Sequence, residues 1–184
     1  MKTIKYFAGL LLLSVTLTFF SCEDVVVVGQ NDSDILFQFE YVNHAWGENH
    51  RGFFVVPNGD ILSYNLPEGW IFPVGDSISA SALQNNLLLA TDTIGHVDAV
   101  TLNQMAGYVG EVFAGKLTEP KNLMADAGSE GYFVYRWDQD SNVYKRATLL
   151  IRGDFYQENN SPGAKIIAGW LIGLNDGGMF NEEK

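Results

Sequence analysis

Alternating hydrophobic and polar positions identify the first predicted strand of this chain. In the segment 35–43 (ILFQFEYVN), aromatic residues occupy every second position, and Leu36, Gln38 and Glu40 stand between them. A period of two is typical of a β-strand with one buried face. We therefore predict a half-buried strand over Ile35–Asn43.

Two further segments have the pattern of β-hairpins. The tetrapeptide Pro57–Asp60 contains an Asn-Gly pair, which strongly favours a tight hairpin turn. The polar residues 138–142 form a second candidate turn. Each turn lies between two apolar runs, Gly52–Val56 and Ile61–Tyr64 for the first, Gly131–Trp137 and Val143–Arg152 for the second.

Apolar residues recur at intervals of three and four in three other segments, which predicts amphipathic helices. These are Ser77–Leu89, with Ser77 or Ser79 as the cap, then Asp98–Phe113, and a last helix with Ser161 as N-cap and Pro162 as its first residue. In the last helix we expect five residues to face inward: Ile166, Ile167, Trp170, Leu171 and Leu174.

The order of strand, hairpin, two helices, hairpin and helix predicts an α+β fold. Its hairpins would form an antiparallel sheet, and about three helices would most simply pack on one face of that sheet. We expect a single globular domain over residues 35–184, because a chain of this size can bury one substantial core. Residues 22–34 would form the tether that precedes it.

Residues 1–21 have the parts of a secretory signal peptide. Two lysines form a positive start, an apolar run extends from about Tyr6 to Phe20, and Ser21 places a small residue before Cys22. This pattern resembles a bacterial lipoprotein signal, in which the cysteine is acylated, commonly with palmitate, and the chain is cut before it. The resemblance implies that a lipid on Cys22 anchors the protein to a membrane.

Two other interpretations of this segment fit less well. A transmembrane helix needs roughly 20 apolar residues, and the run here is shorter. A conventionally cleaved signal needs a small residue where Phe19 stands. The lipoprotein pattern is itself incomplete, since Phe19 and Phe20 replace its usual Leu and then Ala or Ser, so the conventional signal stays the alternative.

Cys22 is the single cysteine of the chain. An unpaired thiol in an exported protein calls for an explanation, and acylation supplies one. The mature domain would then fold without disulfides and without thiolate chemistry.

The charge of the mature chain excludes one class of partner. Removing residues 1–21 takes away two basic and no acidic residues, which leaves 9 basic and 22 acidic residues and a formal charge of −13. Nucleic acids and anionic lipid surfaces are bound by clustered Lys and Arg. We therefore expect no nucleic-acid partner.

Three groups of residues invite a metal-site hypothesis. His44, Glu48 and His50 (in HAWGENH) are zinc-type ligands, but a third protein ligand such as His96 would have to come from far along the chain. Histidines that cap loop turns explain this group better. We predict no metal and no cofactor here.

The other two groups are acidic. The segment 138–142 (DQDSN) resembles the start of an EF-hand loop, but that loop needs Gly and Glu where this chain has Val143 and Leu149. Turn formation explains these residues better. A different kind of calcium site from Asp126, Glu130 and Asp154 stays open.

Nucleophile and phosphate-binding motifs are absent from the sequence: it has no G-x-S-x-G, S-x-x-K or Walker-type segment. Paired carboxylates for hydrolysis of an extracellular polymer stay an alternative, for example Asp126 with Asp154, because the fold sets their separation.

Tryptophans in glycine-containing segments are the best candidates for ligand contact. Trp46 and Trp70 lie near glycines, His50 is close to the first, and Trp137 stands at a hairpin end. Exposed indoles can stack on sugar rings or bind a protein. Closure of loops over the core is the alternative role of these side chains.

Several short segments resemble small Bacteroidetes-type lipoproteins of undefined function. They are the Ser21-Cys22 ending followed by Glu23 and Asp24, then Ala45-Trp46-Gly47, Gly52-Phe53-Phe54, Asn58-Gly59-Asp60, Asp126-Ala127-Gly128, Gly153-Asp154-Phe155, Asn160-Ser161-Pro162, Ala164 and Trp170-Leu171. Acidic residues behind the cysteine resemble an export signal for surface lipoproteins. The resemblance implies an outer-membrane anchor, with the domain on the cell surface or facing the periplasm, and implies no activity.

We therefore expect a non-enzymatic binding or accessory lipoprotein of the bacterial cell envelope. Its partner would be a glycan or a protein, bound at Trp46, His50, Trp70 and Trp137. The alternatives are the hydrolase described above and a structural role in envelope assembly.

Overall fold

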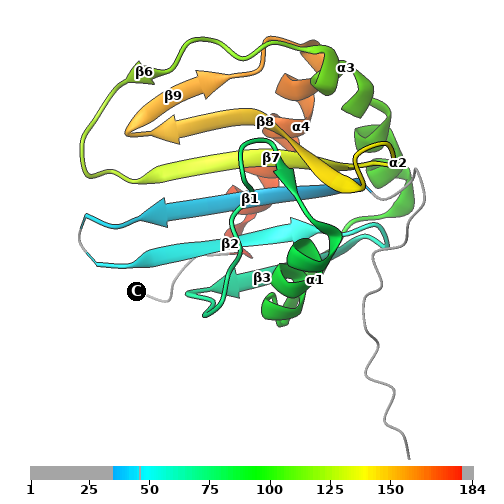
Figure 1. Ribbon diagram of the computed structural model, residues 1–184, viewed down its shortest axis with the longest axis horizontal. Helices are drawn as coiled ribbons and strands as arrows, with labels where there is room; N and C mark the ends of the chain where they lie inside the picture. The colour runs from blue at the N-terminus through cyan, green and yellow to red at the C-terminus, as the bar shows by residue number, and fades with distance from the viewer. Residues whose placement is uncertain (1–34, 46, 180–184) are drawn as a thin grey trace, which may run out of the picture.

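An antiparallel sheet of nine strands forms the centre of the protein (Figure 1). The computed structural model describes residues 35–45 and 47–179. The strands are β1 (Ile35–Asn43), β2 (Asn49–Val55), β3 (Asp60–Asn65), β4 (Ser77–Ile78), β5 (Asp92–His96), β6 (Lys121–Asn122), β7 (Ser129–Asp138), β8 (Val143–Gly153) and β9 (Phe155–Glu158). Their order across the sheet is β5-β3-β2-β1-β7-β8-β9-β6, and β4 pairs with β8.

Four α-helices accompany this sheet in the described part of the chain. They are α1 (Ala80–Leu89), α2 (Ala99–Gly107), α3 (Val109–Ala114) and α4 (Pro162–Leu174), and a π-helical turn, η1 (Asn175–Met179), follows α4. The single-domain α+β fold and the antiparallel sheet predicted from the sequence are confirmed.

The predicted strands and hairpins are present, with small changes at their ends. The bounds of β1 match the prediction, and the turns at 57–60 and 138–142 each join two antiparallel neighbours. The sequence patterns did not reveal β5 (DTIGH) or β9 (FYQE). Both are short and mostly exposed or half-buried, so they lack a buried face that would show as alternation.

Two helices begin at predicted caps, but the inclusion of Ser77 and Ile78 in the first helix is wrong, because these two residues form β4. The hydroxyl of Ser79 accepts from the backbone N–H of Ala82, and that of Ser161 accepts from Ala164. The predicted helix 98–113 is divided at Tyr108 into α2 and α3. In α4 the prediction for Ile166 is wrong: this side chain is 40% exposed, whereas Ile167 and Leu171 are fully buried.

Helices cover both faces of the sheet, so the predicted placement on one face is wrong. The first core lies between the sheet and α2, α3 and α4; it includes Phe37, Phe53, Val109, Ile167 and Leu171. The second core lies on the opposite face, where Leu83 and Leu87 of α1 pack against Phe54, Leu62 and Tyr64. Figure 1 shows α1 in front of the sheet and α4 behind it.

Strand β1 is buried on both faces, not on one. It is central in the sheet and pairs with β2 on one side and β7 on the other. Its aromatic residues enter the first core, and Leu36 enters the second. As a result Gln38 and Glu40, predicted to face solvent, are 1% and 8% exposed.

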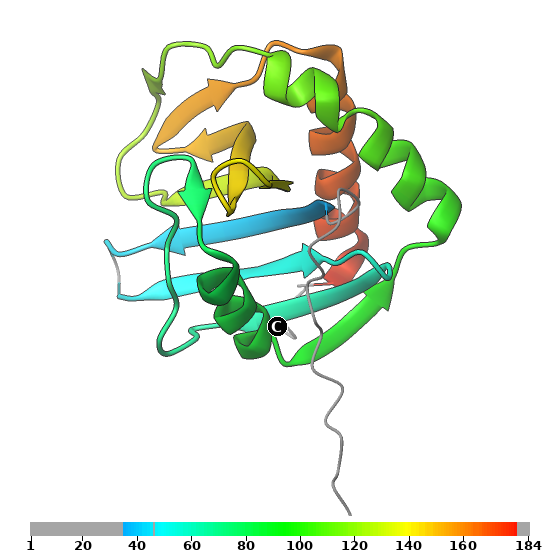
Figure 2. The same cartoon turned by 45° about the vertical axis from the view of Figure 1, so that its right-hand side comes forward.

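Residues 66–76 connect β3 to β4, and we call this segment the strap. It begins directly after β3 and ends at β4, which pairs with the first residues of β8. Since β2, β1 and β7 lie between β3 and β8 in the sheet, the strap crosses these strands on the face of the second core (Figures 1 and 2).

Candidate functional site

His50 lies on β2 and forms a buried pair with Glu40 of β1. Its Nε2 atom is 3.0 Å from Oε1 of Glu40, and the side chains are 6% and 11% exposed. The predicted role of His50 as a turn cap in a loop is therefore wrong: the residue is part of the sheet. Glu40 stands opposite Gly52 in the register and His50 opposite Val42, so the two side chains share one face.

The strap places two aromatic rings over His50. The ring of Phe72 stacks on the imidazole at 5.2 Å between centroids, and the indole of Trp70 meets it edge-on at 4.9 Å. Trp70 also packs on Tyr64 at 4.2 Å and on Phe54 at 5.8 Å. The structure thus brings the predicted residues His50 and Trp70 together, although Trp70 is packed into the second core, not free in a loop.

A hydrogen-bonded row lies beside this pair. The hydroxyl of Tyr135 donates to Oε1 of Gln38 at 2.6 Å, and Nε2 of Gln38 donates to the hydroxyl of Tyr64 at 2.8 Å. The Tyr64 hydroxyl in turn donates to the carbonyl oxygen of Phe39. Each buried polar group in this row has a partner, which burial requires.

Burial keeps the two phenols of this row protonated. It raises the pKa of Tyr64 well above 10.0, and the nearby Glu40 carboxylate raises it further. Burial also raises the pKa of Tyr135, although Arg146 opposes this effect. Both hydroxyls are therefore donors at neutral pH, and neither is suited to act as a base.

Two glycines leave room for aromatic rings on either side of Glu40. Gly52 and Gly131 are its partners in the register on β2 and β7. A Cβ atom at Gly52 would collide with the Tyr64 ring and the Phe39 carbonyl, and one at Gly131 would collide with Phe133. The rings of Tyr64 and Phe133 therefore lie over glycine backbone, which completes the packing around Glu40.

Asn86 of α1 ties the strap to the body of the protein. Its Oδ1 accepts from the N–H of Ile71 at 2.9 Å and its Nδ2 donates to the carbonyl of Ile71 at 2.7 Å. Asn86 is 2% exposed. Asn85 adds one hydrogen bond, to the carbonyl of Gly69.

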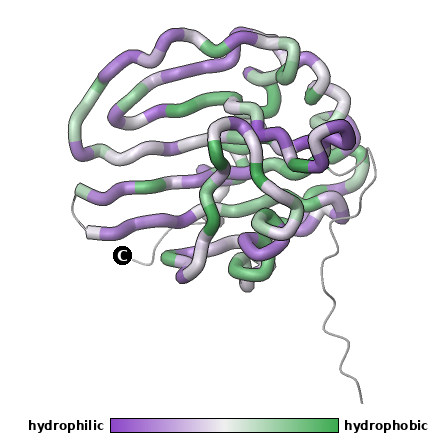
Figure 3. The backbone as a smooth tube through the Cα atoms, viewed as in Figure 1, coloured by the Kyte–Doolittle hydropathy of each residue, from purple (hydrophilic) through white to green (hydrophobic). Residues whose placement is uncertain are grey.

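The strap carries several exposed apolar side chains, and Figure 3 shows hydrophobic positions along its backbone. Phe72 is 50% exposed and Val74 is 85% exposed, and the backbone N–H and carbonyl of Val74 both bond to the backbone of Ser77. Four large side chains contribute: Leu66, Ile71, Phe72 and Val74. We call these four residues the strap patch.

Trp137 lies elsewhere in the protein. It is 8% exposed and packs edge-on against Tyr144 at 5.1 Å. It lies on β7 next to Arg136, which pairs with Ile35, whereas His50 pairs with Val42. Seven residues of strand separate these positions, about 23 Å. The structure therefore does not bring Trp137 to the His50–Trp70 group.

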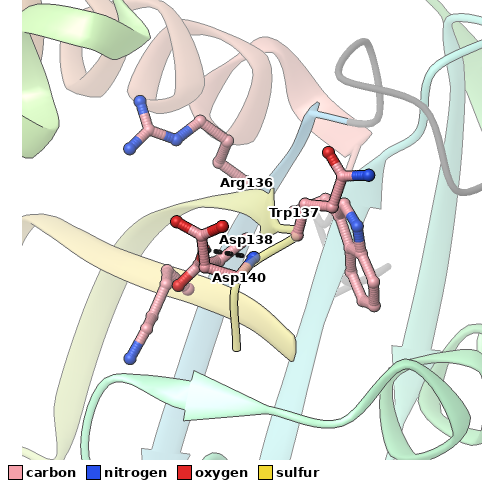
Figure 4. Close-up of a pocket in the computed structure, with 6 residues that line it drawn as sticks. Arg136, Trp137, Asp138 and Asp140 are labelled. Atoms are coloured by element: carbon pink, nitrogen blue, oxygen red, sulfur yellow. Dashed lines mark hydrogen bonds between the residues drawn. The ribbon is translucent and has the colours of Figure 1, made fainter. Parts of the chain in front are cut away.

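A pocket of about 550 Å³ lies at the β7–β8 hairpin beside Trp137 (Figure 4). In the figure the side chains of Arg136 and Trp137 point away from each other. Asp138 accepts hydrogen bonds from the backbone of Asp140 and the hydroxyl of Ser141. These bonds lower its pKa, with the Ser141 bond as the largest cause. Asp138 therefore stabilises the hairpin turn. This is the role predicted for residues 138–142 in preference to a calcium loop.

Several other candidate ligands serve local structure. Oδ1 of Asp154 accepts from the N–H of Ala127 at 2.8 Å, and Glu130 forms an ion pair with Arg152. His96 bonds to Asp60, and His44 is exposed. Within residues 35–45 and 47–179, no three His, Cys, Asp or Glu side chains come together as a metal site.

Two predicted site residues, Cys22 and Trp46, lie outside the described residues. Glu40, Asn86 and Phe72 also belong to the site and were not predicted from the sequence. The sequence contained one signal for Glu40. Positions 38 and 40 are polar in a strand that otherwise has core residues. Nothing in the local sequence distinguishes Asn86 from its neighbour Asn85.

Comparison of the chain with protein-family models, curated proteins and solved structures gives no match. The described helices include none that is long and apolar enough to cross a bilayer.

Proposed function

We propose that this protein is a lipid-anchored, non-enzymatic binding module of the bacterial cell envelope, and that its partner is a protein. The anchor is the acylated Cys22, and the binding surface includes the strap patch. The single observation that carries the proposal is the exposure of four large apolar side chains on an ordered, hydrogen-bonded segment.

An apolar patch on an ordered surface is typical of a protein-binding site. Single exposed apolar residues are normal on a protein surface, whereas four of them lie within residues 66–74 here. Here Asn86 holds the strap through both backbone groups of Ile71, so little conformational entropy would be lost on binding. The patch is therefore prepared for a partner.

The geometry favours a protein over a glycan. Trp70, the aromatic residue of the strap that was expected to contact a sugar, packs on Tyr64, Phe54 and His50 within the protein, which leaves Phe72 as the exposed aromatic ring of the strap patch. Aliphatic side chains form most of the exposed area of the patch, and such side chains match the apolar centre of a protein interface.

Photo-crosslinking in the producing cells tests the proposal. A photoreactive amino acid would replace Val74, and Val100 of α2 is a matched control, because both are valines with exposed fractions of 85% and 79%. We expect a discrete protein adduct from position 74 and not from position 100, and Phe72→Asp should abolish it. No adduct, or the same adducts from both positions, would contradict the proposal.

A glycan array with the purified protein distinguishes the other class of partner. Saturable glycan binding that Phe72→Ala removes would replace the protein partner with a sugar. The anchor is tested separately: Cys22→Ser should eliminate labelling by a radioactive fatty acid, whereas a labelled Cys22→Ser chain would exclude acylation at this residue.

A further inference from the structure

The outer edge of β8 changes its bonding partner at a β-bulge. The N–H of Arg146 donates outward to the carbonyl of Asp76 at 2.6 Å, and the carbonyl of Leu149 accepts from the N–H of Asn159 at 3.0 Å. Arg146 and Leu149 are three positions apart, and strict alternation would turn them to opposite sides. Both face outward because the pairing with β7 contains a bulge at Leu149. One outer strand cannot follow both halves of β8, so two separate segments cover the edge.

Two backbone groups of β8 face outward between these segments. In an antiparallel strand the N–H and the carbonyl of one residue point to the same side, and successive residues alternate. The carbonyl of Arg146 and the N–H of Thr148 therefore point to the outer edge. Within residues 35–45 and 47–179, no hydrogen bond reaches either group from that side. Both residues are half-buried, so one acceptor and one donor are available to a molecule that enters here.

A cleft of about 330 Å³ opens at this point of the edge. Thr148 lines it from β8, Phe113 and Leu117 line it from α3 and the segment after α3, and Gly75 and Asp76 line it from the end of the strap. Leu117 is 45% exposed, so the apolar wall is accessible. Sites for small molecules typically combine an apolar wall with a few fixed polar groups in a volume of this order.

The charges around the cleft favour a neutral ligand. The carboxylate of Asp76 lies 3.4 Å from Nζ of Lys145, and the guanidinium of Arg146 lies over the ring of Phe133 at 4.3 Å. Both charged lining residues thus interact within the protein. An ionic ligand would compete with these contacts, whereas a neutral one would leave them in place.

We propose that this cleft binds a small neutral molecule that carries an amide group beside an apolar group. The amide oxygen accepts from the N–H of Thr148, and the amide N–H donates to the carbonyl of Arg146. The apolar group covers Phe113 and Leu117. This is a second site, next to the strap patch, and it goes beyond the proposed function because it does not depend on a protein partner.

Nuclear magnetic resonance titration of the processed, detergent-solubilised lipoprotein tests this inference. The probes are N-benzylacetamide, N-isobutylacetamide and N-cyclohexylacetamide, which share the amide and differ in the apolar group. We expect at least one of them to move the Thr148 amide proton downfield and to saturate with a Kd of about 5 mM or lower, the affinity that an ordinary ligand efficiency gives molecules of this size.

The corresponding acetate esters are matched controls for the amide. They keep the shape and the carbonyl oxygen of the probes but have no N–H to donate to Arg146. We expect each ester to bind at least about threefold more weakly than its amide, because one hydrogen bond is lost.

A pair of leucine variants tests the apolar wall. Leu117→Ala should weaken binding of the best amide at least about threefold, whereas Leu123→Ala, at a leucine that is 57% exposed on another segment, should leave it unchanged. The amide spectrum of each variant shows whether it is folded, and the ester comparison tests the inference without any variant.

Three results would overturn the inference: no saturable shift of the Thr148 amide with any of the three probes, equal binding of amide and ester, or equal binding by the two leucine variants. The crosslinking result at Val74 is independent of these outcomes. A protein adduct at Val74 without amide binding would leave the proposed function standing, and amide binding without the adduct would leave the cleft as a small-molecule site.

Discussion

The Nε2 atom of His50 lies 3.0 Å from Oε1 of Glu40 inside the second core, under the rings of Trp70 and Phe72. Two polar residues ten positions apart thus form a buried pair that helps to position the strap. Because the strap carries the exposed apolar patch, this pair connects the interior of the sheet with the proposed binding surface.

Glu40→Ala should lower the free energy of unfolding by about 3 kcal/mol, since removal of one member of a buried pair leaves the other without its partner. Urea denaturation at pH 7 measures this change. Glu48→Ala is the control, because Glu48 is exposed in the segment before β2 and should change stability by less than about 0.5 kcal/mol. Equal effects of the two variants would show that the pair is not important for stability.

Tyr135→Phe should remove about 1 kcal/mol, because Gln38 loses a donor at 2.6 Å. Burial raises the pKa of Tyr135, so its contribution is fully present below pH 10 and is lost at higher pH, where the unfolded chain ionises first. Urea denaturation between pH 7 and 11 should show a steeper loss for the unsubstituted protein than for the variant. Parallel curves would contradict this assignment.

Asn86→Ala should release the strap, because both backbone groups of Ile71 lose their partner. We expect faster amide exchange over residues 69–73 and a loss of about 2 kcal/mol in the free energy of unfolding. Asn85→Ala removes one bond at a half-buried residue and should have less than half the effect. Unchanged exchange in Asn86→Ala would mean that ring packing alone holds the strap.

Gly52→Ala should destabilise the protein by about 2 kcal/mol or more, because its Cβ would collide with the Phe39 carbonyl and displace Tyr64. Gly169→Ala in α4 is the opposite case: nothing lies within 4 Å of that Cβ, and alanine should stabilise the helix by up to about 1 kcal/mol. Thermal unfolding of both variants should shift in opposite directions. A neutral Gly52→Ala would contradict the packing described around Glu40.

Local patterns predicted most individual elements. Turn chemistry at 57–60 and serine caps at 79 and 161 depend on neighbouring residues alone, so they could be recognised without the fold. The division at Tyr108 and the short strands β5 and β9 could not be recognised, since their stability comes from packing and from a partner strand.

The candidate site was predicted only in part. His50 and Trp70 were selected for their chemistry, and the structure places them 4.9 Å apart, but in a core and not on a loop surface. Asn86 and Glu40 were not selected, because their importance comes from contacts with residues 15 and 10 positions away in the chain.

The sequence by itself determined the antiparallel α+β class, the caps and the turns, because each rests on interactions within a few residues. Tertiary structure alone decided that helices cover both faces of the sheet, which buries Gln38 and Glu40. It also decided that Ala147 and Thr148 of β8, between the pairings with β4 and β9, have no outer strand partner among the described residues. Both features depend on which distant segments meet across the sheet, and a local pattern contains no information about that meeting.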